Sequence, residues 1–397
     1  MAGAAVEGEL SATARGADAT GSSRGAADVE FAVATRADEA ELRALLSATP
    51  TRGGAVSLGF EREPDYFAGE NVGGAADTTI VARRGGRVVC MGRCSRRVVY
   101  VGGEKREAGY LGELRLAPGT RGGLAVLRAG YAFFAQYEAA REEGAADFYF
   151  TSVATGNARA RAVLENGRKM GLPEYAARAE LVTVAWPVRR AARAAGAAET
   201  EMSEEAKDEL SYFLDTEARR LALAMPWVVE TWASLAAHGL KTADYCVVRR
   251  AGRIVAAGGV WDQSAWRQTV VAGYAGVLKW GRGLVNAAAW VAGRPGLPAV
   301  GERLRQACVH PLAVAVDASA AEVGELLGKL ESRAVGRGVE WLVVSVAEED
   351  GLRAVLKRRA GAREYATRLY EVRLPGLATR GGFEVNGQRV RPEAGLL

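Results

Sequence analysis

A glycine-rich segment between residues 118 and 123 has the composition of an anion-binding turn. It joins an expected strand that ends at Leu116 to an expected helix that begins at Gly123. The first N–H groups of a helix have no partner within the helix and therefore bind anions well. Gly122 and Gly123 would let the backbone approach a ligand closely, and Arg121 could pair with a phosphate oxygen. The pattern predicts a pyrophosphate site, although the same residues could form only a tight connection.

The elements that would position this turn follow from hydrophobic periodicity. Alternating apolar residues predict strands, and apolar residues three and four apart predict helices. The first half then contains a strand, a helix, a meander of strands, the helix after the turn, a buried strand, a short helix and a final strand. Their expected ranges are 29–35, 39–46, 78–82, 88–93, 97–101, 108–116, 123–144, 147–153, 158–165 and 180–184. We expect an α+β fold with a mixed, mostly antiparallel sheet flanked by helices.

The second half repeats this order of elements in outline, which suggests a duplication. A helix is expected over 204–223, then a hairpin over 245–261 followed by further strands. Strands are also expected at 312–316, 340–346 and 367–373, and helices at 321–334 and 352–359. A chain of 397 residues can form two cores. We therefore expect two tandem domains, 29–186 and 202–375, with a disordered tail over 1–28, a linker over 187–201 and a C-terminal tail over 376–397.

Two segments of the first half resemble motifs of the GNAT superfamily of N-acyltransferases. In that family a Val-x-Pro-x-x-Arg-Gly-x-Gly-x-Gly/Ala segment binds the pyrophosphate of coenzyme A. An Asn-x-x-Ala-x-x-x-Tyr-Glu-x-x-Gly segment lies beside the pantetheine and the thiol. The matching residues are Leu116, Pro118, Arg121, Gly122, Gly123 and Ala125 in the first segment and Asn157, Ala160, Glu165 and Gly167 in the second. The resemblance covers residues 29–186 at the level of motifs and 202–374 in outline.

The resemblance implies two GNAT-like domains, of which the second is degenerate, and an acyl-CoA co-substrate, most simply acetyl-CoA, with no metal. The implied acceptor is a primary amine of a small molecule, an amino acid or a peptide. By the same resemblance, the residues that bind the donor are Leu114, Leu116, Thr120, Arg121, Gly122, Gly123, Leu124, Ala125 and Asn157.

The chain departs from the family pattern in three places. The turn has one residue fewer between Arg121 and Ala125, so Thr120 could take the position that Arg or Gln normally holds. Leu164 stands where the family often has the tyrosine that protonates the departing thiolate. The remaining sources of this proton would be Tyr149, Tyr137 or water. The second segment also ends one residue early, at Gly167.

Acyl transfer to an amine needs a group that takes a proton from the ammonium. Glu113 is the best candidate for this catalytic base, because it lies on the strand that ends at Leu116 and faces away from Leu114 and Leu116. A surface glutamate or one paired across the sheet is the alternative. The resemblance implies that backbone N–H near Leu116 stabilises the oxyanion, and losing such a donor typically costs about 3 kcal/mol.

The second half has no glycine-rich turn. Its corresponding segment, Val316–Glu322, carries two acidic residues that would repel a pyrophosphate. We expect this half to shape the acceptor pocket or to replace the partner of a homodimer. The aromatic residues of 261–268 could line a cleft or pack in a core. His310 could supply a base across the interface, although a single histidine at a strand end more often has a structural role.

Composition limits the other classes of protein. Hydrophobic residues make up 49% of the chain, but no apolar run reaches the roughly 20 residues that span a bilayer, so no membrane partner is expected. The N-terminal residues lack the features of a secretion signal, which favours the cytoplasm. Four scattered cysteines, Cys90, Cys94, Cys246 and Cys308, and two distant histidines predict reduced thiols and no metal site.

The net charge of +5 and the pI near 9.0 do not by themselves indicate a nucleic-acid partner, because the arginines are dispersed. The tightest basic cluster, residues 189–193, contains no aromatic residue that could stack on a base. Two other functions stay open. One is an aminoacyl-tRNA-dependent transferase of tandem GNAT type, and the other is a non-catalytic GNAT-fold binding or sensor protein. The oligomeric state, monomer or homodimer, is open as well.

Overall fold

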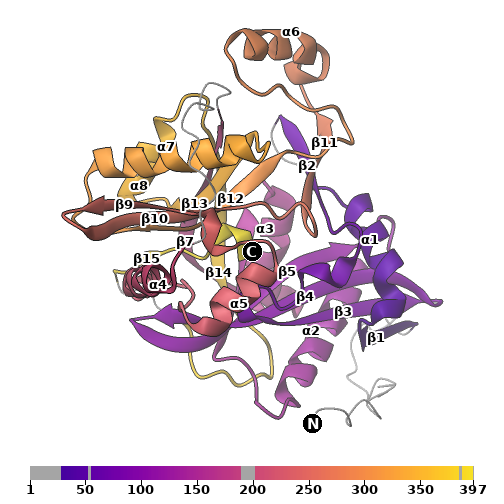
Figure 1. Cartoon of the computed structure of the whole chain (residues 1–397). Coiled ribbons are helices and arrows are strands. Elements are labelled where there is room, and N and C mark those ends of the chain that lie inside the picture. The colour runs from indigo at the N-terminus through magenta and orange to yellow at the C-terminus, as the bar shows by residue number, and fades with distance from the viewer. Residues whose placement is uncertain (1–27, 52–54, 189–201, 384–386, 397) are drawn as a thin grey trace.

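The computed structural model describes residues 28–51, 55–188, 202–383 and 387–396. Eleven strands from both halves of the chain form one continuous sheet in this part of the protein (Figure 1). Most neighbouring strands are antiparallel, and the parallel pairs are β5 with β6 and β12 with β13. The order across the sheet is β1 (Val29–Val33), β3 (Ala76–Arg84), β4 (Arg87–Val101), β5 (Glu104–Leu116), β6 (Phe148–Ala154), β14 (Arg363–Arg373), β7 (Glu174–Pro187), β13 (Trp341–Ala347), β12 (Gln306–Val314), β10 (Arg253–Trp261) and β9 (Tyr245–Arg250).

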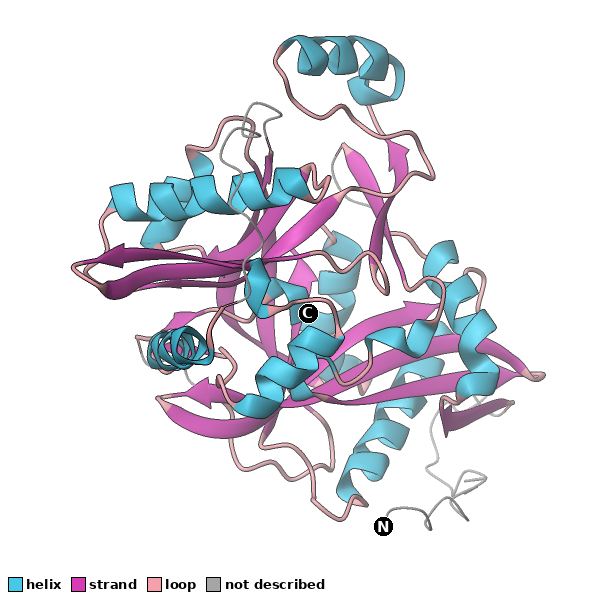
Figure 2. Cartoon of the chain, in the orientation of Figure 1, coloured by secondary structure: helices cyan, strands magenta, loops and turns pink. Residues whose placement is uncertain are grey.

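Helices cover the sheet on both faces (Figure 2). Helices α7 and α4 lie on opposite sides of the β9–β10 hairpin, and α2 packs near β1 and β3 (Figure 1). The expected fold class, an α+β fold with a mostly antiparallel sheet flanked by helices, is confirmed. The helices are α1 (Glu39–Ala48), α2 (Gly123–Ala139), α3 (Ala158–Glu165), α4 (Glu204–Ala218), α5 (Val229–Ala237), α6 (Val277–Val291), α7 (Ala320–Gly336) and α8 (Gly351–Lys357), with short 3-10 helices at Arg36–Asp38, Tyr66–Gly69, Val72–Gly74, Gly167–Met170, Thr242–Asp244 and Ala394–Leu396.

The two halves of the chain exchange their last strands. Strand β14 of the second half lies between β6 and β7 of the first, and β7 lies between β14 and β13 of the second. The β7–β14 pairing runs from Arg363 opposite Ala185 to Arg373 opposite Glu174. Val182, Val184 and Trp186 of β7 consequently pack in the core around α7. The division into two tandem domains stays a prediction, and one continuous sheet joins the two halves.

Two small sheets add further links between distant segments. Strand β2 (Val56–Glu61) pairs with β11 (Gln268–Tyr274), and β8 (Leu221–Ala222) pairs with β15 (Arg389–Val390). Val390 and Leu396 are buried, so part of the expected C-terminal tail over 376–397 packs against the folded body. The expected N-terminal tail, except Asp28, and most of the expected linker over 187–201 lie outside the described residues.

Three local expectations differ from the structure. The expected strands at 88–93 and 97–101 are one long strand, β4, because the intervening residues Cys94, Ser95 and Arg96 are buried and pair with β5. The expected helix over 204–223 ends at Ala218, since Leu221 pairs in β8. The segment after β11, expected to contain further strands, forms helix α6. No described helix combines the length and the hydrophobicity needed to cross a bilayer.

Candidate active site

Strands β5 and β6 pair for only three residues and then separate. The parallel pairing joins Ala108–Tyr110 to Phe148–Phe150, whereas β5 continues to Leu116 and β6 to Ala154. The register of β5 against β4 shifts beside Glu113, whose φ is 51°. Such a bulge bends the strand away from its neighbour. We call the resulting opening between β5 and β6 the first gap.

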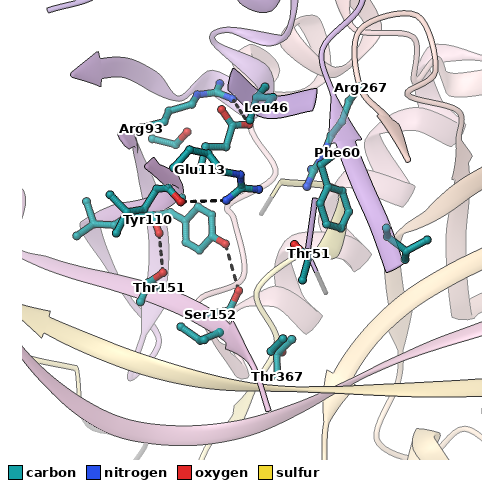
Figure 3. A pocket seen from close by; sticks show the side chains of 18 of the residues that line it. Leu46, Thr51, Phe60, Arg93, Tyr110, Glu113, Thr151, Ser152, Arg267 and Thr367 are labelled. Atoms are coloured by element: carbon teal, nitrogen blue, oxygen red, sulfur yellow. Dashed lines mark hydrogen bonds and ion pairs between the residues drawn. The ribbon is translucent and has the colours of Figure 1, made fainter. Parts of the chain in front are cut away.

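The first gap leads into a cavity of about 900 Å³. Both halves of the chain contribute to its wall, including strands β5, β6, β14, β7, β13 and β12 and residues 261–268. Figure 3 draws Tyr110, Thr151 and Ser152 on one side of the cavity and Phe60 and Arg267 on the other. A cavity of this size suits a ligand as large as a small-molecule cofactor or substrate.

The glycine-rich turn follows directly after the free end of β5. Gly119 and Gly122 have φ values of 80° and 65°, a backbone conformation that favours glycine. A Cβ at Gly123 would lie 2.7 Å from Leu116 Cδ2, so a larger residue there would force the Leu116 side chain to move. Gly122 has no side chain to cap α2, and no other described side chain bonds to the first N–H groups of this helix. These N–H groups are therefore available to an anion.

The other donor residues predicted from sequence fall into two groups. Leu114 and Asn157 line the cavity, and Asn157 also caps α3 by accepting a hydrogen bond of 3.1 Å from the Ala160 N–H. Leu116 and residues 120–125 lie outside the cavity wall, next to Val126 and Leu127, which line it. Thr120 Oγ1 closes the turn by donating to the Ala117 carbonyl at 2.7 Å. The donor roles of all these residues remain predictions.

Glu113 lies on the cavity wall with both of its carboxylate oxygens engaged. Arg62 Nε donates to Oε1 at 2.6 Å, and the Tyr66 hydroxyl donates to Oε2 at 2.9 Å (Figure 3 shows the Glu113 side chain). Burial alone would raise the pKa of Glu113, but the Arg62 guanidinium holds this pKa below its usual value. Glu113 is therefore ionised and able to accept a proton, but it is a weak base. Its catalytic role remains a prediction.

Neither tyrosine that the sequence offered as a general acid lines the cavity. Tyr149 is fully buried behind the sheet, where its hydroxyl donates to Glu138 Oε2 at 2.5 Å. Burial raises the pKa of Tyr149. Tyr137 lies on α2 with Arg141 over its ring, away from the cavity. Leu164, at the position of the family tyrosine, does line the cavity.

The cavity contains polar side chains that sequence reasoning missed. The Tyr110 hydroxyl lies 3.1 Å from Ser152 Oγ, one residue from each side of the first gap (Figure 3). Burial raises the pKa of Tyr110. Asp77 is a second buried carboxylate of the wall, paired with Arg93 at 2.9 Å, and burial raises its pKa. On β5, Tyr110 shares the strand face of Gly112, and this alternation was the sequence signal that could have identified it. No sequence signal marked Asp77.

The second half has a corresponding opening, which we call the second gap. Strands β12 and β13 pair in parallel only through Cys308 and Val343 and then separate. C-terminal residues fill this place: Arg391 donates to the Leu312 carbonyl at 2.7 Å and pairs with Asp350, which follows β13. His310 is fully buried beside Glu393 and two tryptophans and is not part of the cavity wall, so it does not face a ligand in this cavity.

The helix that follows the second gap is closed to anions by its own residues. Ser319 Oγ accepts from the Glu322 N–H at 3.3 Å, and the Glu322 carboxylate accepts from the Ser319 N–H at 2.7 Å. This capping box satisfies the helix end and places negative charge there. The aromatic segment 261–268, in contrast, does line the cavity through residues such as Trp261, Trp266 and Arg267.

The described residues contain no group of three or more potential metal ligands. The four cysteines are buried and unpaired. Burial raises the pKa of the Cys90 thiol to about 12 and that of Cys308 to about 11, so both are protonated at neutral pH. The structure therefore offers no thiolate nucleophile among them.

The chain was compared with known families, curated proteins and solved structures. No protein-family model matches the chain, and a search of curated proteins gives no match. One similar solved structure is a GCN5-related glucosamine N-acetyltransferase region of a fungal multi-domain beta-N-acetylglucosaminidase, with 18% identity, a TM-score of 0.45 and coverage of 74% of this chain and 33% of that one. Another is a probable N-acyltransferase from Enterococcus faecalis, with 9% identity, a TM-score of 0.39 and coverage of 87% and 72%.

The chain thus spans about a third of the length of the first of these proteins. At these TM-scores the similarity is limited to the general arrangement of helices and strands. The residues of the cavity and of the glycine-rich turn are more informative about function.

Proposed function

We propose that this protein is an N-acyltransferase of GNAT type that moves an acyl group, most simply acetyl, from coenzyme A to a primary amine. One observation carries the proposal: a helix entered through Gly122 and Gly123 has an uncapped N-terminus, and it stands at the end of a strand gap that opens into a large cavity. The helix end suits the pyrophosphate and the first gap suits the narrow pantetheine arm.

The chemistry needs two proton movements. The acceptor ammonium loses one proton to become an amine, its nitrogen then forms the C–N bond, and the C–S bond of the thioester breaks. The second proton of the nitrogen leaves as the amide forms, and one proton ends on the coenzyme A thiolate. In our proposal Glu113 accepts the first proton directly or through one water, and the Tyr110–Ser152 pair is the nearest hydroxyl source for the thiolate.

Positioning supplies much of the remaining rate. The free backbone of β5 beyond Tyr110 could donate an N–H to the thioester oxygen, as the resemblance implies for the region near Leu116. Holding thioester and amine in one cavity turns a bimolecular step into an effectively intramolecular one. The donor residues Leu114, Leu116, Thr120, Arg121, Gly122, Gly123, Leu124, Ala125 and Asn157 belong to this proposal, as does a location in the cytoplasm.

Calorimetry with acetyl-CoA tests the donor site. We expect wild-type protein to bind, and Gly123→Glu to weaken binding by about 100-fold or more, because it adds a clash with Leu116 and a negative charge at the helix end. Ala320→Glu is the matched control, since Ala320 is the exposed first residue of α7 in the second half. Its donor affinity should equal that of wild type. Absence of binding, or equal binding by Gly123→Glu, would refute the donor site.

Turnover distinguishes an enzyme from a binding protein. The engaged oxygens of Glu113 and the leucine at position 164 are the observations that favour a non-catalytic sensor of the same fold. Thiol release from acetyl-CoA, measured with a mixed library of amines and peptides, should exceed the background hydrolysis rate. Donor binding without release for any acceptor would support the sensor, and salt-sensitive RNA binding would favour a tRNA-dependent transferase.

A further inference from the structure

The cavity wall contains more buried positive charge than its own carboxylates neutralise. Asp77 and Glu113 are already paired with Arg93 and Arg62. The remaining wall arginines whose pKa is lowered by burial have no carboxylate partner among the described residues; these are Arg97, Arg115 and Arg267. Guanidinium groups stay charged even when buried, so this excess is costly unless something offsets it.

The hydrogen bonds of these three arginines are sparse. Arg97 donates once, to the Leu396 carbonyl at 3.1 Å, and Arg115 donates once, to the Leu114 carbonyl at 3.1 Å. The Nε atoms of Arg97 and Arg115 are buried and have no hydrogen-bond partner. The Arg267 guanidinium has no hydrogen-bond or ion-pair partner among the described residues, and it projects beside Phe60 on the wall across from Tyr110 (Figure 3).

The donor does not account for this excess. Its phosphates are assigned to the turn and the start of α2, residues 120–125, which lie outside the cavity wall, and its pantetheine arm carries no charge. Arg97 and Arg267 both line the cavity and lie within electrostatic range of each other and of Tyr110.

We propose that the acceptor is an amine that also carries a carboxylate, and that Arg267 binds this carboxylate with Arg97 close by. The inference rests on the proposed acyl transfer and names its substrate class. A guanidinium binds a carboxylate through two parallel hydrogen bonds, which would fix the orientation of the amine. The same positive charge disfavours a second cation, so it promotes loss of the proton that the ammonium must give up.

Matched pairs of acceptors test this assignment. Thiol release from acetyl-CoA is measured with L-phenylalanine against phenethylamine, L-histidine against histamine and L-lysine against cadaverine. We expect kcat/KM to be at least about 10-fold higher for the amino acid of at least one pair, because a buried charge pair discriminates strongly. Arg267→Gln should raise KM for that amino acid about 10-fold or more and leave the matched amine unchanged.

Two further variants keep the test decisive. Arg267→Lys retains the charge without the two-pronged geometry and should give an intermediate KM, whereas Arg253→Gln, an exposed residue outside the cavity, should behave as wild type. Equal use of both members of every pair, or an equal effect of Arg267→Gln on both, would overturn the carboxylate assignment while leaving acyl transfer intact. Failure to bind acetyl-CoA would instead refute the underlying function.

Helix α6 carries an independent feature, an apolar stripe that faces solvent. Val277, Trp280, Leu284 and Val291 are 86%, 85%, 81% and 79% exposed, and their spacing places them on one side of the helix. The opposite side faces the chain's own loop, where Asn286 exchanges hydrogen bonds with Leu297. In an ordinary surface helix the apolar face packs on the core, whereas here it faces solvent. The helix projects at the edge of the molecule (Figure 1).

The geometry points to an anionic membrane surface as the partner of this stripe. Lys279 and Arg282 flank it, and no acidic residue occurs between 276 and 301. Two copies of such a helix would bring like charges together, and one helix face is much smaller than a stable dimer interface. Tryptophan with basic residues on an amphipathic helix is typical of segments that lie in a lipid headgroup region. This contact is peripheral and differs from a membrane span.

Vesicle sedimentation with the full chain tests the membrane assignment. We expect binding to vesicles that contain about one-third phosphatidylglycerol, weak binding to pure phosphatidylcholine, and a loss of binding as salt rises. Trp280→Ser with Leu284→Ser should lower partitioning about 10-fold. Val316→Ser removes an equally exposed valine elsewhere and should have no effect. Absence of vesicle binding, or a concentration-dependent dimer that Leu284→Ser abolishes, would overturn the assignment.

Discussion

The first and second gaps occupy equivalent places in the two halves of the chain but have opposite contents. Between β5 and β6 the strands separate and a cavity begins. Between β12 and β13 they also separate, but Arg391 bridges the Leu312 carbonyl and Asp350 across the opening. One copy of the same architectural feature is thus left open for a ligand, and the other is sealed by the chain itself.

The helices that follow the two gaps differ in the same sense. Helix α2 begins at glycines and leaves its N–H groups open, whereas α7 begins at Ser319 and satisfies them with a capping box. The exchange of β7 and β14 joins the halves into one sheet, so the sealed half can serve as a rigid wall for the open one. In our proposal the open half binds the donor, and the sealed half supports the cavity.

Removal of the C-terminal seal should produce the largest loss of stability. Arg391→Ala leaves the buried Asp350 without its main partner, and we expect the free energy of unfolding to fall by about 3–5 kcal/mol. Arg389→Ala removes a more exposed partner of the same carboxylate at 3.4 Å and should cost about 1 kcal/mol or less. Denaturant unfolding measures both values. Equal losses would show that Arg391 does not seal the second gap.

The same ion pair predicts a pH dependence. Burial alone would raise the pKa of Asp350, but Arg391 holds it below its usual value. A carboxyl whose pKa is lowered on folding contributes stability above its unfolded pKa of about 3.9, and this contribution is lost as the pH falls through the lower folded pKa. The difference in unfolding free energy between wild type and Arg391→Ala should therefore shrink below about pH 4.

Substitution of one buried carboxylate in each half of the chain should have different effects on activity. Glu113→Gln keeps one oxygen that accepts from Arg62, and its amide NH2 faces the Tyr66 hydroxyl, but it cannot take a proton, so we expect kcat to fall about 100-fold with little change in acetyl-CoA affinity. Glu393→Gln, beside His310 in the second half, should leave kcat unchanged. Steady-state kinetics with the best acceptor measures both. Unchanged kcat in Glu113→Gln would transfer the base role to another group, with Asp77 as the next candidate.

The sequence indicated the local elements of the site but not its enclosure. The change from strand to helix periodicity around Gly123, and the glycines of the turn, are local signals, and the structure contains both elements. The Arg62–Glu113 pair joins residues 51 positions apart, so no spacing rule could reveal it. The insertion of β14 between β6 and β7 likewise depends on pairing across nearly two hundred residues.

Helix α6 shows a different reason for failure. Gly281 and Gly283 lower the helix propensity of this segment, and Trp280 and Trp290 are residues that favour strands. The segment therefore resembles strands joined by a turn. Its apolar residues also gave no clue to their exposure, because periodicity identifies an apolar face without saying what covers it. The prediction that Tyr149 could supply the proton failed for a related reason. The buried Glu138 that accepts from its hydroxyl lies on another element, α2, which the position of Tyr149 in its strand does not reveal.

The smallest expected effects come from the two helix ends and would sharpen the comparison between them. Ser319→Ala removes the cap of α7 and should lower the free energy of unfolding by about 1 kcal/mol, with acetyl-CoA affinity unchanged. Thr120→Ala removes the hydroxyl that closes the turn before α2, and we expect a loss of donor affinity of a few-fold with a smaller change in stability. Calorimetry and denaturant unfolding on the same preparations measure both quantities. If Thr120→Ala altered stability alone, the turn before α2 would be as structural as its counterpart, and the distinction between an open and a sealed half would then depend on the cavity.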